Sequence, residues 1–523
     1  MKYKKFFLKI LYAIFFALLI MLLIKIDFRL VEEIPCCGDD YDYYLHAETI
    51  AIDGNLSFKD QNLGEFKYTY NDIEAPVGFF GSGFLASPFL FIGNALFGIF
   101  EVDAPISLFN YKIVLYSIAP IFYIFCTHYL IYFSLKHLHI YPNKKMLLVF
   151  LFSGGVQYYA FERFSMTHVY EVFGVALILF LSLTYYSSNN KIISILLPIS
   201  ISLGLLVRMS NYYLFLLPVF IASLVQKKDI FLIKRYLRKD IYFYIGVSSA
   251  ALLYYFFSLN IYGRLILNPQ KIYAPDLLIT NFIYNDLSIF EEVISILNSL
   301  KVVLFSFEFG ILWTNPILFF GLLICILHLR NFHSLILVIC FLQNFYIIHI
   351  WQSTASSYGF RYLYSLTPMF IIYLLVHLHK ESTIYKLTII FSFFSLIQYL
   401  FFEANLLTQL STDYLLNSFG NEVVYSSPNY VIGAIKSIFI LESYLNIFTT
   451  SFLGVFFFKI ILTFFGSEQL ILLLNSLSLP VYNQDFLDYL DKIKDVNYLK
   501  IFLLSFIPFI FGLFLHQKEG ENK

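Results

Sequence analysis

The sequence predicts an all-α polytopic membrane protein, a bundle of roughly 11–13 transmembrane helices at about 20 residues each. Of its 523 residues, 59% are hydrophobic and only 13% are charged, whereas soluble domains carry roughly 25% charged residues. The mean hydropathy is +0.73. No soluble core could bury 62 Phe and 42 Tyr at this density. The net charge is zero, so the composition suggests no nucleic-acid partner.

The first predicted span runs from Phe6 to Ile24 and follows the basic start Met1–Lys5. It lacks a small-x-small cleavage site, which favours an uncleaved first span over a signal peptide. The basic start places the N-terminus in the cytoplasm. Residues 25–77 then lie outside and form the longest polar stretch in the first half of the chain.

The next apolar segment, 79–100, is long enough to cross the membrane but contains four Gly and one Pro. Glu101 and Asp103 follow it and indicate the outer side. The span after it, 107–133, ends in the basic loop 136–145, which is typical of the cytoplasmic side. Both indications hold only if 79–100 lies along the membrane or dips into it without crossing.

The remaining apolar runs predict alternating spans. They are 146–161, 172–186, 192–207, 212–225, 241–259, 309–327, 334–350, 362–377 and 387–402, with weaker stretches near 444–465 and 498–515. Residues 1–403 therefore form one predicted transmembrane module, whose outer loop is 25–106 and carries juxtamembrane helices. Residues 404–523 form a C-terminal outer loop and the last membrane helices, with no assigned role. The side on which the C-terminus lies stays open.

Arginine is distributed against the positive-inside tendency. Five of the eight arginines fall on the predicted outer side, namely Arg29, Arg163, Arg208, Arg264 and Arg361. The planar guanidinium suits phosphate or carboxylate and stays charged near lipid. We expect an anionic headgroup as the outer partner. The alternative is pairing with outer carboxylates such as Glu162.

The most polar stretch, Cys36–Tyr44, carries three carboxylates just past the first span: Asp39, Asp40 and Asp42. Like charges placed together raise one another's pKa, so this cluster indicates a function. A sugar linked through phosphate to a polyprenol needs a carboxylate to activate the acceptor and cations or polar donors for the phosphate. It also needs a groove for the lipid. For Asp42, an ordinary solvated loop charge is the alternative. The five cysteines have no metal-ligand spacing.

The order of several short motifs resembles the GT-C membrane glycosyltransferases. The closest branch is the protein-mannosyltransferase and aminoarabinose-transferase type, family 39-type. The resemblance covers about residues 1–380 and rests on these stretches: Gly38-Asp-Asp-x-x-Tyr-Tyr44, Gly54-Asn-Leu56, Ala75-Pro-Val-Gly78, Leu85-Ala-Ser-Pro88, Ser165-Met-Thr-His168, Arg208 with Asn211 and Pro218, Asn315-Pro316, and Trp351 to Pro368. It implies a GT-C bundle and supports the non-crossing interpretation of 79–100.

The resemblance also implies roles for single residues. Asp39 would be the base or orient the acceptor, and Asp40 would assist it or bind a cation. Arg208 and Arg361 would contact the donor phosphate. His168 stands where many members have Asp, and it would either support the residues that contact the ligand or replace that carboxylate. Hard divalent cations prefer oxygen ligands, so His168 puts metal binding in doubt. The alternative for His168 is a hydrogen-bonded residue at the start of a helix. The other residues assigned to substrate binding are Asp42, Tyr43, Glu162, His168 and Tyr358, although Tyr358 also suits an interfacial aromatic belt.

The activity that the resemblance implies is transfer of a sugar from a polyprenyl-phosphate donor to a glycolipid, glycan or protein on the outer face of the plasma or bacterial inner membrane. The expected partners are this donor, membrane lipids and the acceptor. No cofactor is certain, and a divalent cation stays open. One alternative is a transporter or flippase of lipid-linked glycans, which the predicted uncharged span centres disfavour. Another is an oligosaccharide polymerase or ligase. A nucleotide-sugar donor is disfavoured because the chain has no Gly-rich phosphate loop.

Overall fold

The computed structural model describes most of the chain between residues 30 and 409. It leaves out 32–33, 36–38, 60, 64–66, 101–110, 162–163, 189, 227–239, 270–271, 273–288, 308–309, 351–358 and 379–381, and beyond 409 it describes only 438–439, 465, 469, 472 and 476. The described part is mostly helical, as the sequence predicts. The first span and nearly all of the C-terminal region, 404–523, lie outside the described residues.

Four of the described helices are long and apolar enough to cross a membrane. They are the Tyr116–His137 part of α4 (Tyr111–His137), α7 (His168–Ser187), α11 (Ile241–Tyr262) and α17 (Phe332–Ile350). At 1.5 Å per residue, a helix of about 20 residues matches the roughly 30 Å hydrocarbon layer of a bilayer. These helices support a multi-pass membrane protein, while the higher predicted number of spans stays a prediction.

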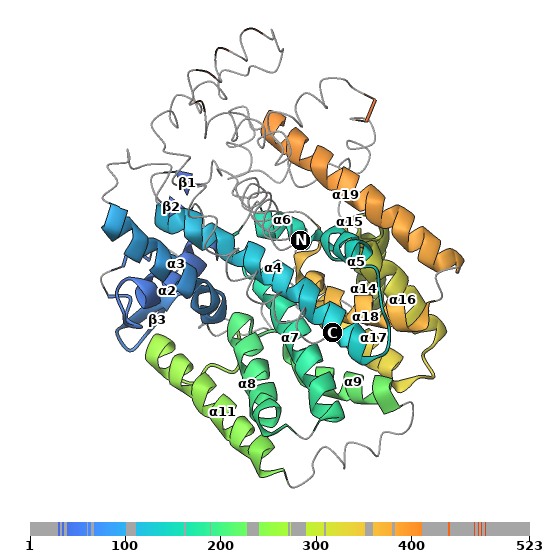
Figure 1. The fold of residues 1–523 in the computed structure, drawn as a ribbon, viewed down its shortest axis with the longest axis horizontal. Helices are drawn as coiled ribbons and strands as arrows, with labels where there is room; N and C mark the ends of the chain where they lie inside the picture. The colour runs from blue at the N-terminus through green and yellow to red at the C-terminus, as the bar shows by residue number, and fades with distance from the viewer. Residues whose placement is uncertain are drawn as a thin grey trace, which may run out of the picture.

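The remaining helices of the bundle range from the four-residue α15 to the 27-residue α19. They are α8 (Lys191–Val207), η2 (Tyr212–Leu216), α9 (Leu217–Gln226), α14 (Ile289–Phe305), α15 (Ile311–Thr314), α16 (Pro316–Leu327), η4 (Arg361–Leu366), α18 (Thr367–His377) and α19 (Thr383–Gln409). Helix α7 is central and packs against α4, α8, α9, α18 and η4 (Figure 1). Helix α11 lies at the edge of the bundle against α8 and leaves large apolar side chains exposed, as a lipid-facing helix would.

The predicted outer loop folds into a compact unit beside α4. It contains β1 (Leu30–Val31), β2 (Ile34–Pro35), α2 (Asp39–Ala51), β3 (Lys67–Tyr70), β4 (Ile73–Pro76) and α3 (Phe80–Phe100). Helix α3 packs against both α2 and α4 (Figure 1). It covers the segment 79–100 as a single helix with Pro88 inside it. Whether this helix crosses the membrane stays a prediction.

The β3–β4 hairpin connects the outer loop to α11. Its two-residue turn, Asn71-Asp72, has positive φ at both positions, 46° and 63°, which matches the twist of a tight hairpin. The Tyr68 hydroxyl donates to the Tyr262 carbonyl at 3.0 Å. The Arg264 guanidinium lies 4.4 Å from the centre of the Tyr70 ring. This outer arginine thus stacks on an aromatic ring of the hairpin.

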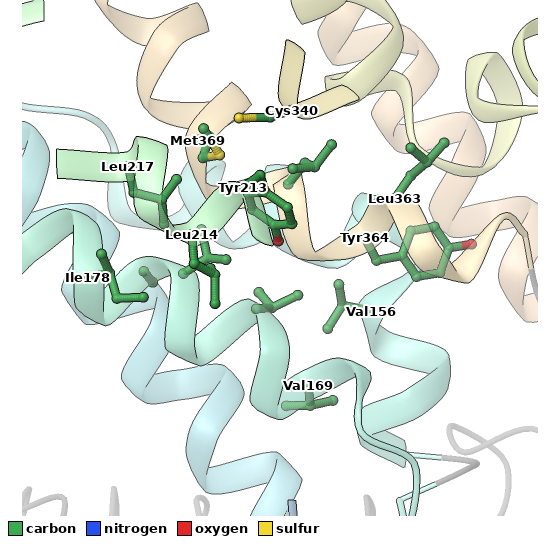
Figure 2. Packing of buried hydrophobic residues seen from close by; sticks show 14 of the residues in the cluster. Val156, Val169, Ile178, Tyr213, Leu214, Leu217, Cys340, Leu363, Tyr364 and Met369 are labelled. Carbon is green, nitrogen blue, oxygen red and sulfur yellow. The ribbon is translucent and has the colours of Figure 1, made fainter. Parts of the chain in front are cut away.

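The predicted span 146–161 is not one regular helix. It is divided into α5 (Lys144–Leu151), a π-helical turn η1 (Phe152–Val156) and α6 (Gln157–Phe161). Gly155 has φ 80° there, and a Cβ at this position would lie 2.3 Å from Cζ of Tyr364. Figure 2 shows Val156 of η1 and Tyr364 of η4 in one buried cluster. The segment is helical throughout but irregular at this turn, and whether it crosses the membrane stays a prediction.

A second interrupted helix, α15–α16, is hydrogen-bonded to the turn η1. Helices α15 and α16 are separated at Asn315, whose side chain accepts from the Leu318 amide and caps α16. The same side chain donates to the Gly154 carbonyl at 2.9 Å and to Thr367 Oγ1 at 3.0 Å. A buried side chain thus satisfies a carbonyl that the irregular turn leaves outside the helical ladder, as a membrane interior requires.

Candidate functional site

Asp39 and Arg361 form an ion pair between residues that are 322 positions apart in sequence. Asp39 begins α2 and Arg361 begins η4, and the Arg361 Nη2 to Asp39 Oδ2 distance is 3.9 Å. The Asp39 side chain is 38% exposed and that of Arg361 is 14% exposed. A carboxylate in the first turn of a helix is stabilised by the helix dipole. The pair therefore offers one anionic and one cationic group that a ligand can reach.

A second charged group lies at the adjacent ends of α7 and α8. Glu171 is in the first turn of α7, and Arg208 follows the last residue of α8. Arg208 Nη1 donates to Glu171 Oε1 at 2.9 Å, and Asn211 Nδ2 donates to Glu171 Oε2 at 3.0 Å. His168 Nδ1 lies 3.1 Å from Glu171 Oε1. Both helix ends favour the charge they carry, so the two helices bring this network together.

Tyr362 joins the two groups. Its ring centre lies 4.1 Å from the Arg208 guanidinium carbon and 5.5 Å from that of Arg361. Tyr159 of α6 also borders these groups, because its ring centre is 4.4 Å from that of His168. Five elements that are separate in sequence therefore contribute to a single site: α2, α6, α7, the end of α8 and η4.

The other two carboxylates of the acidic stretch are placed differently. Asp40 is buried, with 4% of its surface exposed. Asp42 is buried as well, and its Oδ2 accepts from the Gly78 amide at 3.0 Å. Burial and the nearby charge of Asp39 raise the pKa of Asp42 to about 7, although the bond from Gly78 opposes this shift. The carboxylate of Asp42 thus holds α2 to the segment that precedes α3.

Tyr43 is buried beside Gly78, where an added Cβ would lie 3.1 Å from its ring. The sequence predicts Asp42 and Tyr43 as substrate-binding residues, but the structure places both in packing contacts with this segment. Glu162 and Tyr358, also predicted to bind substrate, lie outside the described residues. Of the predicted site residues, the structure brings together Asp39, His168, Arg208 and Arg361.

The sequence analysis places Asn211 in a motif with Arg208 but predicts no site role for Glu171, Asn211, Tyr159 or Tyr362. The first two had a usable signal, since Glu171 stands three residues after His168 and Asn211 three after Arg208. Side chains at that spacing share one face of a helix or turn. The aromatic residues had no such signal, because the chain has 42 Tyr.

The described residues contain no group of three or more His, Cys, Asp or Glu side chains arranged to hold a metal ion. Asp40 is buried and Asp39 pairs with Arg361. Metal dependence therefore stays open.

None of the protein-family models, curated proteins or solved structures compared with this chain matches it.

Proposed function

We propose that the protein is a GT-C-type membrane glycosyltransferase that moves a sugar from a polyprenyl-phosphate donor to an acceptor on the outer face of the membrane. The observation that carries the proposal is the Asp39–Arg361 pair beside the Arg208 network. Two guanidinium groups that share one tyrosine ring, next to a reachable carboxylate, suit a phosphate diester and a hydroxyl acceptor.

The two arginines have unequal roles in this proposal. Arg208 is 8% exposed and already donates to Glu171, so it contributes fixed positive charge. Among the described residues, Arg361 makes one ion pair, a long 3.9 Å contact to Asp39, and lies beside the Tyr362 ring. It can therefore exchange this contact for a phosphate oxygen as the donor binds. The released Asp39 carboxylate then accepts the proton of the acceptor hydroxyl in a hydrogen bond and orients that hydroxyl.

The test is donor binding and sugar transfer by the purified full chain with a polyprenyl-phosphate sugar. We expect Asp39→Asn to lower kcat by about 10²-fold or more while donor binding stays near wild type. Arg361→Gln should weaken donor binding itself. Asp53→Asn is the matched control, because Asp53 is an exposed carboxylate of the same outer loop that bonds only Gln61 within the described chain.

Full transfer activity in Asp39→Asn would overturn the assignment of this residue. The proposed function would be overturned if the wild-type protein transferred no sugar from any lipid-linked donor. The mass of the product distinguishes one added sugar from the whole glycan that a polymerase or ligase would add.

The structure also contains an observation that favours the transporter alternative. The π-helical turn at Gly155 and the interruption at Asn315 are the kind of broken helices found at transport sites. Uptake of a labelled glycolipid by vesicles containing the protein, with no covalent product, would support transport over transfer.

A further inference from the structure

The imidazole of His168 is held in one orientation by a carboxylate. His168 Nδ1 lies 3.1 Å from Glu171 Oε1, and both side chains are buried. A carboxylate can only accept, so Nδ1 carries the proton in this contact and Nε2 keeps its lone pair. Arg208 Nη1 is farther from the same nitrogen, at 3.4 Å. The shorter contact therefore sets the tautomer.

Glu171 is itself fixed by its other partners. Arg208 occupies one of its oxygens together with His168, and Asn211 occupies the second oxygen. A carboxylate with three donors from three positions has little freedom to move. The ring of His168 is further confined by Tyr159, in an edge-on contact with ring centres 4.4 Å apart. His168 is consequently held more firmly than Asp39.

The remaining ring nitrogen has no structural role that the described residues reveal. His168 Nε2 is buried and lacks a hydrogen-bond partner among them. Leaving a buried polar nitrogen unpaired is unfavourable, so it calls for an explanation, of which a catalytic role is one. Asp39, the other candidate base, pairs with Arg361 and is far more exposed. The Nε2 lone pair of the neutral imidazole is therefore available to accept a proton.

We propose that His168 is the general base of the reaction and that Glu171 is its positioning residue. This rests on the proposed function. The acceptor hydroxyl oxygen attacks the anomeric carbon, and its proton passes to His168 Nε2. The bond between the anomeric carbon and the phosphate oxygen breaks, and polyprenyl phosphate leaves beside Arg361. The imidazolium, stabilised by Glu171, then returns its proton to water.

The charges around the ring set the pH dependence. Glu171 lies on the same helix, Arg208 follows α8, and Arg361 acts on the ring from η4. Tyr159 is the titratable group that α6 contributes. Burial of the ring disfavours the imidazolium most, the carboxylate favours it, and the two arginines disfavour it. Transfer should therefore be active where His168 is neutral and should fall as the pH is lowered and the ring is protonated.

The experiment compares His168→Gln and His168→Gly with the wild type in the full chain, measuring donor binding, kcat and the pH profile of kcat. We expect both variants to bind donor like the wild type, to lose about 10²–10⁴-fold in kcat and to lose the acidic limb of the profile. Added imidazole should raise kcat of His168→Gly but not of Asp39→Asn. His128→Gln is the matched control, because His128 is also buried but bonds the Lys144 carbonyl at the other end of the bundle.

Wild-type kcat in His168→Gln would overturn the proposal. So would a folded, donor-binding His168→Gly that imidazole does not rescue and that keeps the acidic limb. These outcomes differ from a failure of the proposed function, in which the wild type itself transfers no sugar. Donor analogues lacking the sugar distinguish base catalysis at the acceptor from an effect on donor binding.

Discussion

Arg208 is a buried cation whose environment is almost fully occupied. Glu171 neutralises it, Tyr362 covers one face of its guanidinium, and Asn211 supports the same carboxylate. A buried charge is tolerated only when it is paired and hydrogen-bonded, and removal of one partner costs about 3–5 kcal/mol. The network is therefore needed for the stability of the fold as well as for the positive electrostatic potential at the site. For this reason Arg361 and Asp39 are the better residues for separating function from folding.

Asp42 should make stability depend on pH. Its pKa is raised from 3.8 to about 7 in the folded protein, so the folded state holds the proton more tightly than the unfolded state. The stabilising effect of the protonated carboxyl is complete below pH 4 and is lost as the pH rises through 7. At about 1.4 kcal/mol per pKa unit, the upper limit of the loss is about 4 kcal/mol.

Asp42→Asn should remove this dependence, because an amide oxygen can still accept from Gly78 but never ionises. The apparent melting temperature of the wild type in detergent should fall between pH 5 and pH 8 by more than that of the variant. Asp53→Asn, at an exposed position, serves as the control and should follow the wild type. Parallel pH curves for wild type and Asp42→Asn would contradict the role given to burial.

At the residue scale, the acidic stretch, the arginines on the predicted outer side and the family resemblance point to Asp39, His168, Arg208 and Arg361, and the structure places these four near one another. Their roles stay predictions. Asp42 shows where such reasoning ends. It stands in the same acidic stretch as Asp39, but the helix turns it toward Gly78. The two stand three residues apart on α2 and so lie near one face. Gly78 covers Asp42, whereas the Asp39 side chain stays 38% exposed, and the sequence alone does not show which segment packs against each.

Among the elements, the interrupted helix α5–η1–α6 departs most from the prediction. Apolar composition alone favours a continuous span, and the residues 146–161 are apolar enough. The pair Gly154-Gly155 was the available signal, since adjacent glycines weaken a helix and permit positive φ. The Asn71-Asp72 turn of the β3–β4 hairpin was a similar signal, because these residue types favour tight hairpin turns. The sequence alone does not show whether either signal interrupts an element, because that depends on the residues that pack against it.

Gly155→Ala should disrupt the packing between η1 and η4. The new Cβ would meet the Tyr364 ring at 2.3 Å, and the positive φ of 80° adds backbone strain. Gly54→Ala separates the two effects, because Gly54 has φ 64° and nothing within 4 Å of an added Cβ. Strain alone costs about 1–2 kcal/mol. The melting temperature should therefore fall clearly further for Gly155→Ala than for Gly54→Ala.

Equal melting temperatures for the two glycine variants would show that η1 and η4 yield easily to the new side chain. Such compliance would favour the transport alternative, in which a broken helix moves. A larger loss in Gly155→Ala would favour a rigid wall behind the site, as a transferase needs to hold its reacting groups in place.

For the molecule as a whole, the site groups lie at one set of helix ends, and Lys144 and Lys191 lie at the other. His168 begins α7 and Arg208 follows α8, whereas the connection between these two helices, near Lys191, is at the opposite end. Lys144 at the start of α5 and Lys191 at the start of α8 both lie over tyrosine rings, at 4.6 Å and 4.9 Å from the ring centres. Lysine on the cytoplasmic side and tyrosine at the interface are typical of membrane proteins.

This polarity predicts the side on which each end is accessible. In a background without the five native cysteines, Asp53→Cys on the outer loop should react with a membrane-impermeant thiol reagent in intact cells. Tyr141→Cys, in the loop between α4 and α5, should react only after the membrane is opened. Tyr141 is 66% exposed, so its lack of labelling in intact cells would reflect sidedness and not burial. Labelling of both positions in intact cells would mean that the two ends of the bundle do not lie on opposite sides of the membrane. The chain directions of α7 and α8 place His168 and Arg208 at the end opposite Lys191. The Asp39–Arg361 pair could then no longer be assigned to a lipid-linked donor on the outer face.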